Sequence, residues 1–588
     1  MKFSSIAIAV AILFTSTVTF AAYEDYNKRY GEYRFTELKE KASVSKNVWV
    51  GSWWAYKSDG LANRFRAAYG DTKYQPLAEG VDRDMLSPAE KIDWLEGRLD
   101  KIDYDPIKAY LDKKKEVGGD VDSWIEERRD LVYTLNRMIE ENQGNADFKW
   151  QDTEEGKKYV ELGEKIEEKQ GELKDLDFIA DTAYEWEIKE HGTYQFGVGS
   201  WWGHCNAWAA AAVMEPEPVK DAVINEIPFN VGDIKGLLTE AWMECNSSFF
   251  GSRNDRHTDE SDRERIDYQD VTPAAFHIFY ADQIGNLDKS FVIDAYTGDQ
   301  VWNHPIKSYW SKCEPQYETP EGGDAAAEKV NVKLTHYGGW YGGDPEVKEL
   351  GEKDVYPVLC YTTFHYVSDG VGHDVLTEPY DFDSMTYDKF KSYYSNHFHK
   401  RTLTYVLWLT APMDDENARI IGDGEWNHGA TSGYTDLHPD FMWQPTANGN
   451  DSNRVYENEF VDYNTLINDI LPQMIADHED PEVEGTEFAS TDTPIEIPDA
   501  APGGVMGVPA VSVINVDQDV TVNELTVTVD ITHTYVGDLQ LVVGHGGKEE
   551  IVKPFQEGGG DDNLQRTYDV KAFDGDSTSG EWKLTVID

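Results

Sequence analysis

The character of the chain changes sharply near residue 190, and this change limits the folds that it can adopt. From Tyr23 to about Glu190 the residues are heavily charged, with apolar side chains recurring every three or four positions. That spacing is typical of amphipathic helices. From Tyr194 to about Tyr463 the chain is rich in aromatic residues and glycine, and its apolar residues alternate as they do in strands. We therefore predict an α+β fold in which a helical region precedes a sheet.

Three helices are predicted in the first region. Ser87, Pro88 and Glu90 have the order of a helix cap, a first helical residue and a capping-box acid, so a helix should run from Pro88 to about Leu99. Two further helices are expected over residues 121–140 and 157–173. We interpret residues 22–190 as a helical accessory region. A pro-segment or a lid over the following domain is the alternative.

The next region, residues 191–477, contains several predicted strands and all four cysteines. Alternation is clearest over Tyr356–Tyr366 and Thr402–Leu409, and shorter strands are expected over Phe276–Tyr280 and Phe291–Asp294. We assign this region to a catalytic domain.

An acidic stretch separates that domain from a small C-terminal module. Residues 478–504 contain four prolines and few aromatic residues, as linkers do. In residues 505–588, alternation over Leu525–Ile531, Leu539–Val543 and Trp582–Val586 predicts strands joined by Gly and Asp turns. The module should be a β-sandwich.

The acidic composition restricts the partners of the protein. Its 588 residues include 110 Asp and Glu but only 53 Lys and Arg, for a formal net charge of −57. Such a surface repels phosphate backbones, so a nucleic-acid binder of the usual basic kind is excluded. The repulsion between copies also favours a soluble monomer.

The first residues have the pattern of a secretory signal peptide. Lys2 precedes an apolar stretch over Ile6–Phe14, and small and polar residues follow up to Ala21, where cleavage is expected. The apolar stretch is shorter than the roughly 20 residues of a membrane-spanning helix, and no later segment comes closer. We expect a secreted or periplasmic protein with no membrane span, in a compartment where disulfides form.

Cys205 is the strongest candidate for a chemical role. It precedes an alanine-rich run that favours a helix. At the start of a helix, free backbone N–H groups and the positive end of the dipole favour a thiolate. A buried, inert cysteine or half of a disulfide is the alternative. If Cys205 is a free nucleophile, then Cys245, Cys313 and Cys360 leave one disulfide and one spare thiol.

His277 and Asp294 are the candidate partners of this thiol. A cysteine nucleophile needs a base, and the base needs an acceptor that orients it. His277 follows Cys205 by 72 residues and Asp294 follows His277 by 17, and we expect the two on adjacent strands. The order Cys, His, Asp is that of papain and of transglutaminases, and the short first interval favours the transglutaminase core. His204 is expected to point away from the thiol.

The anionic intermediate of acyl transfer also needs hydrogen-bond donors. The backbone N–H of Cys205 is one candidate, and the indole of Trp202 or of the adjacent Trp201 is another. Simple packing is the alternative role for the two tryptophans.

The C-terminal module resembles the P domain that follows the protease domains of proprotein convertases. The resemblance rests on the peptides Ile531–Leu539 (ITHTYVGDL), Asp562–Asn563 and Gly580–Leu584 (GEWKL). Family P domains often hold calcium, so the resemblance makes Asp538 and Asp562 candidate ligands. In a chain this acidic, solvated turn residues are the alternative.

Four further peptides are similar to the transglutaminase elicitor family of oomycetes and marine bacteria. The most specific is Val301–Tyr309 (VWNHPIKSY), which is similar to a surface peptide of that family. The others are Ser87–Lys91 (SPAEK), Gly424–Trp426 (GEW) and His438–Trp443 (HPDFMW). Within the first peptide, His304 and Ser308 replace the glutamine and glycine of the family, and these departures are expected to affect recognition rather than chemistry.

This second resemblance implies a papain-like fold and a protein-glutamine γ-glutamyltransferase with Cys205, His277 and Asp294 as its triad. The cysteine would attack a glutamine carboxamide, ammonia would leave, and a lysine amine would resolve the thioester into an isopeptide crosslink. The implied substrates are proteins that present glutamine and lysine side chains, and family activity is associated with calcium. A cysteine protease or glutamine deamidase is one alternative, and a non-enzymatic surface binding protein is the other.

Overall fold

The computed structural model describes residues 33–588 with several gaps. Outside the description lie residues 1–32, 68–73, 78, 80, 144, 146, 194, 254–270, 298–299, 320–324, 337–345, 374–379, 428–437, 449–457, 476–487, 499–507, 517–521, 523–524, 556–562 and 574–575. The chain divides into two compact units, one of Met1–Asn448 with Tyr456–Ala476 and one of Gly449–Val455 with Asp477–Asp588. Each unit is described by itself. The expected signal peptide lies outside the described residues.

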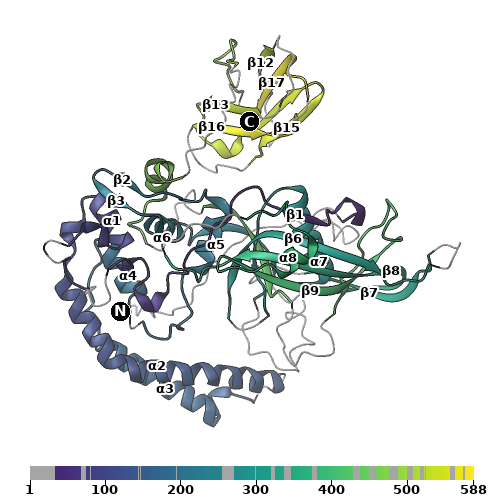
Figure 1. Cartoon of the computed structure of the whole chain (residues 1–588). Coiled ribbons are helices and arrows are strands. Elements are labelled where there is room, and N and C mark those ends of the chain that lie inside the picture. The colour runs from purple at the N-terminus through teal and green to yellow at the C-terminus, as the bar shows by residue number, and fades with distance from the viewer. Residues whose placement is uncertain are drawn as a thin grey trace. The chain divides into compact units, whose positions relative to one another are not determined.

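The helices expected in the first region are present. Helix α1 (Pro88–Leu95) begins with the predicted capping box, in which the Ser87 hydroxyl accepts from the Glu90 N–H and the Glu90 carboxylate accepts from the Ser87 N–H. The second helix, α2 (Tyr104–Glu141), starts 17 residues before the predicted one, and α3 (Glu154–Gly171) follows it. Together α2 and α3 form a long antiparallel hairpin along one edge of the unit (Figure 1).

Six further α-helices are described in this unit. They are α4 (Ala183–His191), α5 (Cys205–Met214), α6 (Val231–Ala241), α7 (Pro273–Tyr280), α8 (Tyr387–Ser392) and α9 (Tyr463–Thr465).

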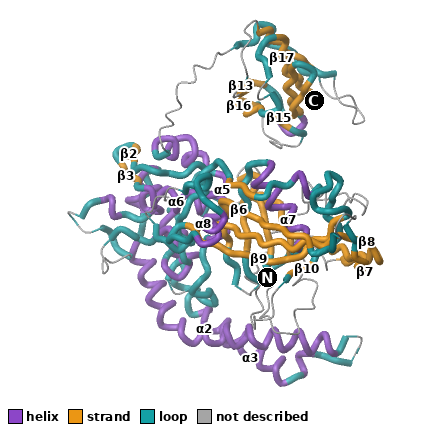
Figure 2. Tube along the Cα trace, turned by 45° about the vertical axis from the view of Figure 1, so that its right-hand side comes forward, coloured by secondary structure: helices purple, strands orange, loops and turns teal. Residues whose placement is uncertain are grey.

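A nine-stranded antiparallel sheet forms the other half of the unit, and helices flank it (Figure 2). Its main path runs β10-β9-β8-β6-β5-β11-β4, while β1 pairs with β6 and β7 pairs with β8. The strands are β1 (Lys41–Ser43), β4 (Cys245–Gly251), β5 (Val292–Asp294), β6 (Asn303–Pro315), β7 (Glu328–His336), β8 (Glu346–Val367), β9 (Phe398–Leu409), β10 (Glu425–Trp426) and β11 (Phe441–Asn448). A separate hairpin joins β2 (Ala222–Ile224) to β3 (Ile227–Phe229).

The predicted strands over Tyr356–Tyr366 and Thr402–Leu409 lie within β8 and β9, so these two predictions are confirmed. The combination of flanking helices with an antiparallel sheet confirms the α+β class.

One predicted strand is wrong. The segment Phe276–Tyr280 belongs to helix α7, whose cap is Thr272 and whose first residue is Pro273. The Thr272 hydroxyl accepts from the Ala275 N–H, which is the usual satisfaction of a free donor at a helix start. Every residue of α7 is buried, so its apolar pattern carries no period that distinguishes a helix from a strand.

The N-terminal region and the sheet share one hydrophobic core. Buried side chains from the first region, such as Trp49, Trp54 and Ile92, belong to the same cluster as Trp208 of α5 and Tyr405 of β9. The boundary expected at residue 190 is therefore not a boundary between compact units. Residues 22–190 therefore contribute to the core of this unit, whereas a lid would only cover a domain that has its own complete core.

The second unit contains six described strands in two sheets. One sheet has the order β12-β17-β14-β15 and the other pairs β13 with β16. The strands are β12 (Ala510–Val516), β13 (Leu525–Ile531), β14 (Gln540–His545), β15 (Lys548–Lys553), β16 (Leu564–Val570) and β17 (Gly580–Ile587). Side chains from both sheets, including Ile531 and Leu541, pack into one core, which makes the unit a β-sandwich.

Within the described part of the chain, no helix is both long enough and apolar enough to cross a membrane.

Candidate active site

Helix α5 begins at Cys205, as the alanine-rich run predicts. Because Cys205 is the first helical residue, its backbone N–H has no acceptor within the helix. The preceding loop is held by the N-terminal region, since the His204 N–H donates to the Trp53 carbonyl at 2.6 Å and the Tyr56 N–H donates to the Trp202 carbonyl at 3.0 Å. The position of the thiol thus depends on backbone hydrogen bonds to residues about 150 positions earlier in the chain.

The start of β6 lies against this thiol. The side-chain amide of Asn303 donates to the Cys205 sulfur at 3.4 Å, and the sulfur lies 3.9 Å from the Val301 carbonyl oxygen. On its other side, Asn303 accepts from the indole N–H of Trp443 at 2.8 Å. An indole only donates, so Trp443 must face the amide oxygen and the NH₂ group must face the sulfur.

Two buried carboxylates complete the surroundings of Cys205. Asp294 ends β5, is the cross-strand partner of Asn303, and accepts from the backbone N–H groups of Tyr296 and Trp302. Asp369 follows β8, and its Oδ2 atom is buried without a hydrogen-bond partner. Burial raises the pKa of Asp369 to about 6 and raises that of Asp294 as well.

The thiol itself is protonated at neutral pH in this environment. Burial and the negative charges of Asp369 and Asp294 raise the pKa of Cys205 to about 11, although the hydrogen bond from Asn303 lowers it. The helix start and the amide therefore favour a thiolate but do not overcome desolvation and the two nearby carboxylates.

The predicted triad does not assemble as expected. Cys205 and Asp294 lie in the same site, but His277 does not. Its Nδ1 atom lies 2.7 Å from the Tyr405 hydroxyl and 2.8 Å from the Tyr280 hydroxyl, and the Tyr280 hydroxyl contacts Ser311 on β6. Ser311 is eight residues beyond Asn303 along that strand, a separation of about 26 Å at roughly 3.3 Å per residue.

His277 instead belongs to a buried polar cluster beside the disulfide. Its ring nitrogen lies within 4.8 Å of the sulfurs of Cys313 and Cys360, which bridge β6 and β8. Burial lowers the pKa of His277 to about 3, so the imidazole is neutral. Cys205 and Cys245 are the free cysteines, which confirms the expectation of one disulfide, one spare thiol and an unbridged Cys205.

Trp202, the predicted oxyanion donor, has no described contact with Cys205. Its ring lies 5.9 Å from the Arg129 guanidinium of α2, and its indole nitrogen lies beside Gly199. Trp201 packs against Trp302, whose backbone N–H donates to Asp294. Of Trp201 and Trp202, Trp201 is therefore the one linked to the site.

The peptide Val301–Tyr309, expected at the surface, lies largely inside the sheet. His304 packs against Tyr366 with ring centroids 4.6 Å apart, and the Ser308 hydroxyl bonds the Tyr380 hydroxyl at 2.6 Å. The two departures from the family peptide therefore lie in contacts within the sheet, and their expected effect on recognition remains a prediction.

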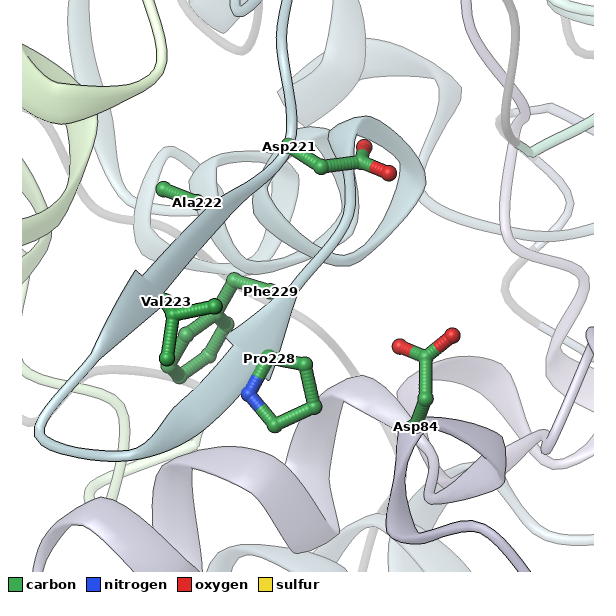
Figure 3. Close-up of a pocket in the computed structure, with 6 residues that line it drawn as sticks. All are labelled: Asp84, Asp221, Ala222, Val223, Pro228 and Phe229. Atoms are coloured by element: carbon green, nitrogen blue, oxygen red, sulfur yellow. The ribbon is translucent and has the colours of Figure 1, made fainter.

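A pocket of about 220 Å³ lies beside the β2–β3 hairpin and contains none of the residues that surround Cys205 (Figure 3). Its two carboxylates are already engaged, because Asp84 pairs with Lys91 at 3.1 Å and Asp221 accepts from the Val231 N–H at 3.0 Å. This pocket therefore offers no unused polar group for the chemistry considered above.

The candidate calcium ligands form no described site. Asp562 lies outside the described residues, and Asp538 lies in a short turn over Val536–Asp538. Among the described residues, neither group of three or more Asp, Glu, His or Cys with ligand atoms close together consists of carboxylates alone. Calcium prefers oxygen ligands, so the described side chains do not by themselves fit this ion.

Asn303, Trp443 and Asp369 were not predicted as site residues. Asn303 and Trp443 stand inside two peptides that resemble the elicitor family, so the signal was present, but nothing in the spacing placed them beside Cys205. Asp369 has no local pattern that distinguishes it from 109 other acidic residues.

Two segments of the chain match known protein families. Residues 181–330, which run from before α4 to the start of β7 and contain Cys205, Asp294 and Asn303, match the transglutaminase elicitor family. Residues 522–588 match the proprotein convertase P-domain. Both resemblances expected from the sequence are confirmed over these residues.

Individual relatives are more distant. The chain is 37% identical over 76 residues to a calcium-dependent protease of a Nostoc species and 36% identical over 76 residues to one of Trichormus variabilis. These matches take in 11% of this chain and 12% of each protease. The crystal structure of the GP42 transglutaminase from Phytophthora sojae aligns with 73% of this chain and 92% of its own, at 20% identity and a TM-score of 0.36.

Proposed function

We propose that this protein is a secreted protein-glutamine γ-glutamyltransferase with Cys205 as its nucleophile. The observation that carries the proposal is the match to the transglutaminase elicitor family of residues 181–330, which contain a free cysteine at the start of a helix. A disulfide between Cys313 and Cys360 supports export, because such bonds persist in oxidising compartments.

In the proposed reaction, the Cys205 sulfur bonds to the glutamine carboxamide carbon and the C–N bond breaks. Ammonia leaves with the proton that the thiol gave up. A lysine amine then attacks the thioester, its nitrogen bonds to the acyl carbon, the C–S bond breaks, and a proton returns to the sulfur. The products are an isopeptide crosslink and the free thiol.

Asn303 and the Cys205 backbone N–H are the proposed donors. The Asn303 NH₂ group lies against the sulfur, where it stabilises the thiolate, and Trp443 holds the amide in that orientation. The free N–H at the start of α5 is placed to stabilise the oxyanion of the tetrahedral intermediate. Trp202 has no part in this scheme.

Asp369 is the proposed acceptor of the thiol proton. Its carboxylate is close enough to Cys205 to influence the thiol pKa, its own pKa is raised to about 6, and its Oδ2 atom has no hydrogen-bond partner. No imidazole contacts Cys205 among the described residues; His257, His428 and His478 lie outside them. Asp294 is proposed as a positioning residue, because it accepts hydrogen bonds from two backbone N–H groups of the β5–β6 connection and so holds that connection beside Cys205.

The test is incorporation of a fluorescent primary amine into a glutamine-rich protein, with and without calcium. The purified full-length protein should incorporate the amine and Cys205→Ala should not. His277→Gln is the matched control, because it replaces the histidine that the sequence alone would have chosen, and it should retain activity per folded molecule. Loss of activity in a folded His277→Gln protein would contradict the proposed site.

Calcium enters the test because two relatives, each matching over 76 residues, are named calcium-dependent proteases. Stimulation by calcium would support a role for that ion in the intact protein, and equal rates with and without it would argue against one.

A hydrolase would be recognised by release of ammonia or cleaved peptide without amine incorporation. A second candidate function, a non-enzymatic binding protein, is favoured by the raised pKa of Cys205, since a protonated thiol is a weak nucleophile. It predicts that the full-length protein and Cys205→Ala are equally inactive.

A further inference from the structure

Four ligand-type side chains converge inside the first unit, immediately behind Cys205. They are Glu187 and His191 of α4, His204 at the cap of α5, and Glu240 of α6, and one ligand atom from each lies within 4.8 Å of all the others. All four residues are buried, and Glu187, His204 and Glu240 are at most 2% exposed.

The distances within this cluster suit a common cation. The His204 Nε2 atom lies 2.8 Å from Glu240 Oε2 and 3.9 Å from Glu187 Oε1, and His191 Nδ1 lies 3.1 Å from Glu187 Oε1. Ligands of a tetrahedral zinc ion with bonds of roughly 2.1 Å are about 3.4 Å apart, within the span of these values.

A hydrogen bond to the backbone fixes the orientation of His204 in the cluster. The His204 Nδ1 atom lies 2.9 Å from the Trp54 carbonyl and must donate to it, so in a neutral ring Nε2 carries a lone pair. That nitrogen lies 2.8 Å from Glu240 Oε2, with which it forms an ion pair when the ring is protonated, and Glu240 Oε1 is buried without a hydrogen-bond partner. An imidazole that donates one N–H to a carbonyl while the other nitrogen faces acceptors is oriented as metal-bound histidines are.

The charges agree with a divalent ion. Two buried carboxylates carry two negative charges, which a divalent cation bound by two neutral imidazoles would cancel.

Surrounding groups hold the four side chains and exclude water. Glu187 accepts from the Leu61 N–H at 3.1 Å and from the Asn458 amide at 3.3 Å. The Tyr56 ring stacks on His191 at 4.2 Å and meets His204 edge-on at 4.7 Å. The site is therefore enclosed by protein, with no side left open to substrate.

We propose that Glu187, His191, His204 and Glu240 bind one zinc-type divalent ion as a structural site. Four protein ligands and an enclosed position are typical of structural rather than catalytic zinc. The ion joins α4 and α6 to the residue that precedes Cys205, so it holds the start of α5 in place. The proposal does not depend on the transglutaminase reaction, because it concerns metal content and stability.

The first experiment measures metal in the purified full-length protein produced with added Zn²⁺ and then desalted. Elemental analysis should find about one equivalent of zinc per chain. After removal with a chelator, Co²⁺ alone should restore one equivalent and give the visible absorption of cobalt bound by nitrogen and oxygen. A folded protein that holds neither ion at stoichiometric level overturns the proposal.

Substitutions test whether the ion binds at this cluster. Glu240→Gln and His191→Gln should reduce zinc content by at least tenfold. Glu215→Gln and His365→Gln, which change buried residues outside the cluster, should retain it, as should Cys205→Ala. Unchanged zinc in Glu240→Gln, or loss of zinc in Cys205→Ala, would overturn the assignment.

A measurement on the unaltered sequence covers the case in which those variants do not fold. Chelation should lower the thermal unfolding midpoint by several degrees, and Zn²⁺ should restore it, because an ion that binds only the native state stabilises that state. A midpoint that chelation does not move would overturn the structural role.

Discussion

At the scale of single residues, the reactivity of Cys205 depends on a balance of opposing contacts. Burial, Asp369 and Asp294 raise its pKa, and the Asn303 amide lowers it. The indole of Trp443 determines which end of that amide faces the sulfur. The residues that tune the thiol thus come from the end of β5, from the starts of β6 and β11, and from the loop after β8.

Replacement of Asn303 tests this balance. Asn303→Ala removes the donor to the sulfur, and a hydrogen bond to a charged group is worth about 1.5–3 kcal/mol, so kcat/KM for amine incorporation should fall about 10- to 100-fold. Trp443→Phe leaves the amide present but free to turn, and should have a smaller effect. Amine incorporation by Asn303→Ala at the rate of the unaltered protein would show that the amide does not act on the thiol.

At the scale of elements, helix α7 explains why His277 was misassigned. The sequence contains a helix-start signal in Thr272 and Pro273, but the buried segment that follows has no amphipathic period. The helix directs His277 into the Tyr280 and Tyr405 hydroxyls, on the part of the sheet that carries the disulfide. A histidine followed 17 residues later by an aspartate therefore suggested a catalytic base and its orienting acceptor, but the fold places the two side chains apart.

The buried imidazole predicts a dependence of stability on acid. Its pKa is about 3 in the folded protein against 6.5 ordinarily, so between these values the unfolded chain binds the proton and the folded protein does not. The free energy of unfolding should thus fall as the pH drops from 6.5 toward 3, by up to about 4 kcal/mol from this residue.

His277→Gln isolates that contribution. The variant should be less stable than the unaltered protein at pH 7, because it loses hydrogen bonds to the two tyrosines, and the difference should shrink as the pH falls. Urea unfolding at pH 7, 5.5 and 4.5 measures both proteins. A difference that stays constant across this range would contradict a neutral, buried His277.

At the scale of the whole molecule, the first region completes the core and the site. Trp49 and Trp54 pack in the main core, and the backbone of residues 53–56 binds the loop that precedes Cys205. The interpretation of residues 22–190 as a removable pro-segment is therefore not favoured. The second unit has its own core and its own sheets.

Truncation tests whether the first region is needed for the core of the first unit and whether the second unit folds independently of it. A chain that begins at residue 191 should fail to fold, because it leaves the apolar faces of α5 and α6 and the sheet without their partners. A chain that ends at residue 476 should fold with the same unfolding transition as the first unit of the full protein. Circular dichroism and amine incorporation measure both. A folded, active chain from residue 191 would restore the pro-segment interpretation.

The sequence by itself determined the features that depend on neighbouring residues. Capping residues and amphipathic periods located α1, α2 and α3, strict alternation located β8 and β9, and the alanine-rich run placed Cys205 at a helix start. These signals are local because backbone hydrogen bonds and one-sided burial repeat over a few residues. The quoted peptides also pointed to the two families that residues 181–330 and 522–588 match.

Only the tertiary structure decided which distant residues meet. The pairing of β5 with β6 and the packing of α5 on them brought Asn303 and Asp294 to Cys205, and the course of α7 took His277 elsewhere. The same packing gathered Glu187, His191, His204 and Glu240 from three helices. Such contacts join residues tens to hundreds of positions apart, and strand register and helix packing select them from many chemically similar side chains.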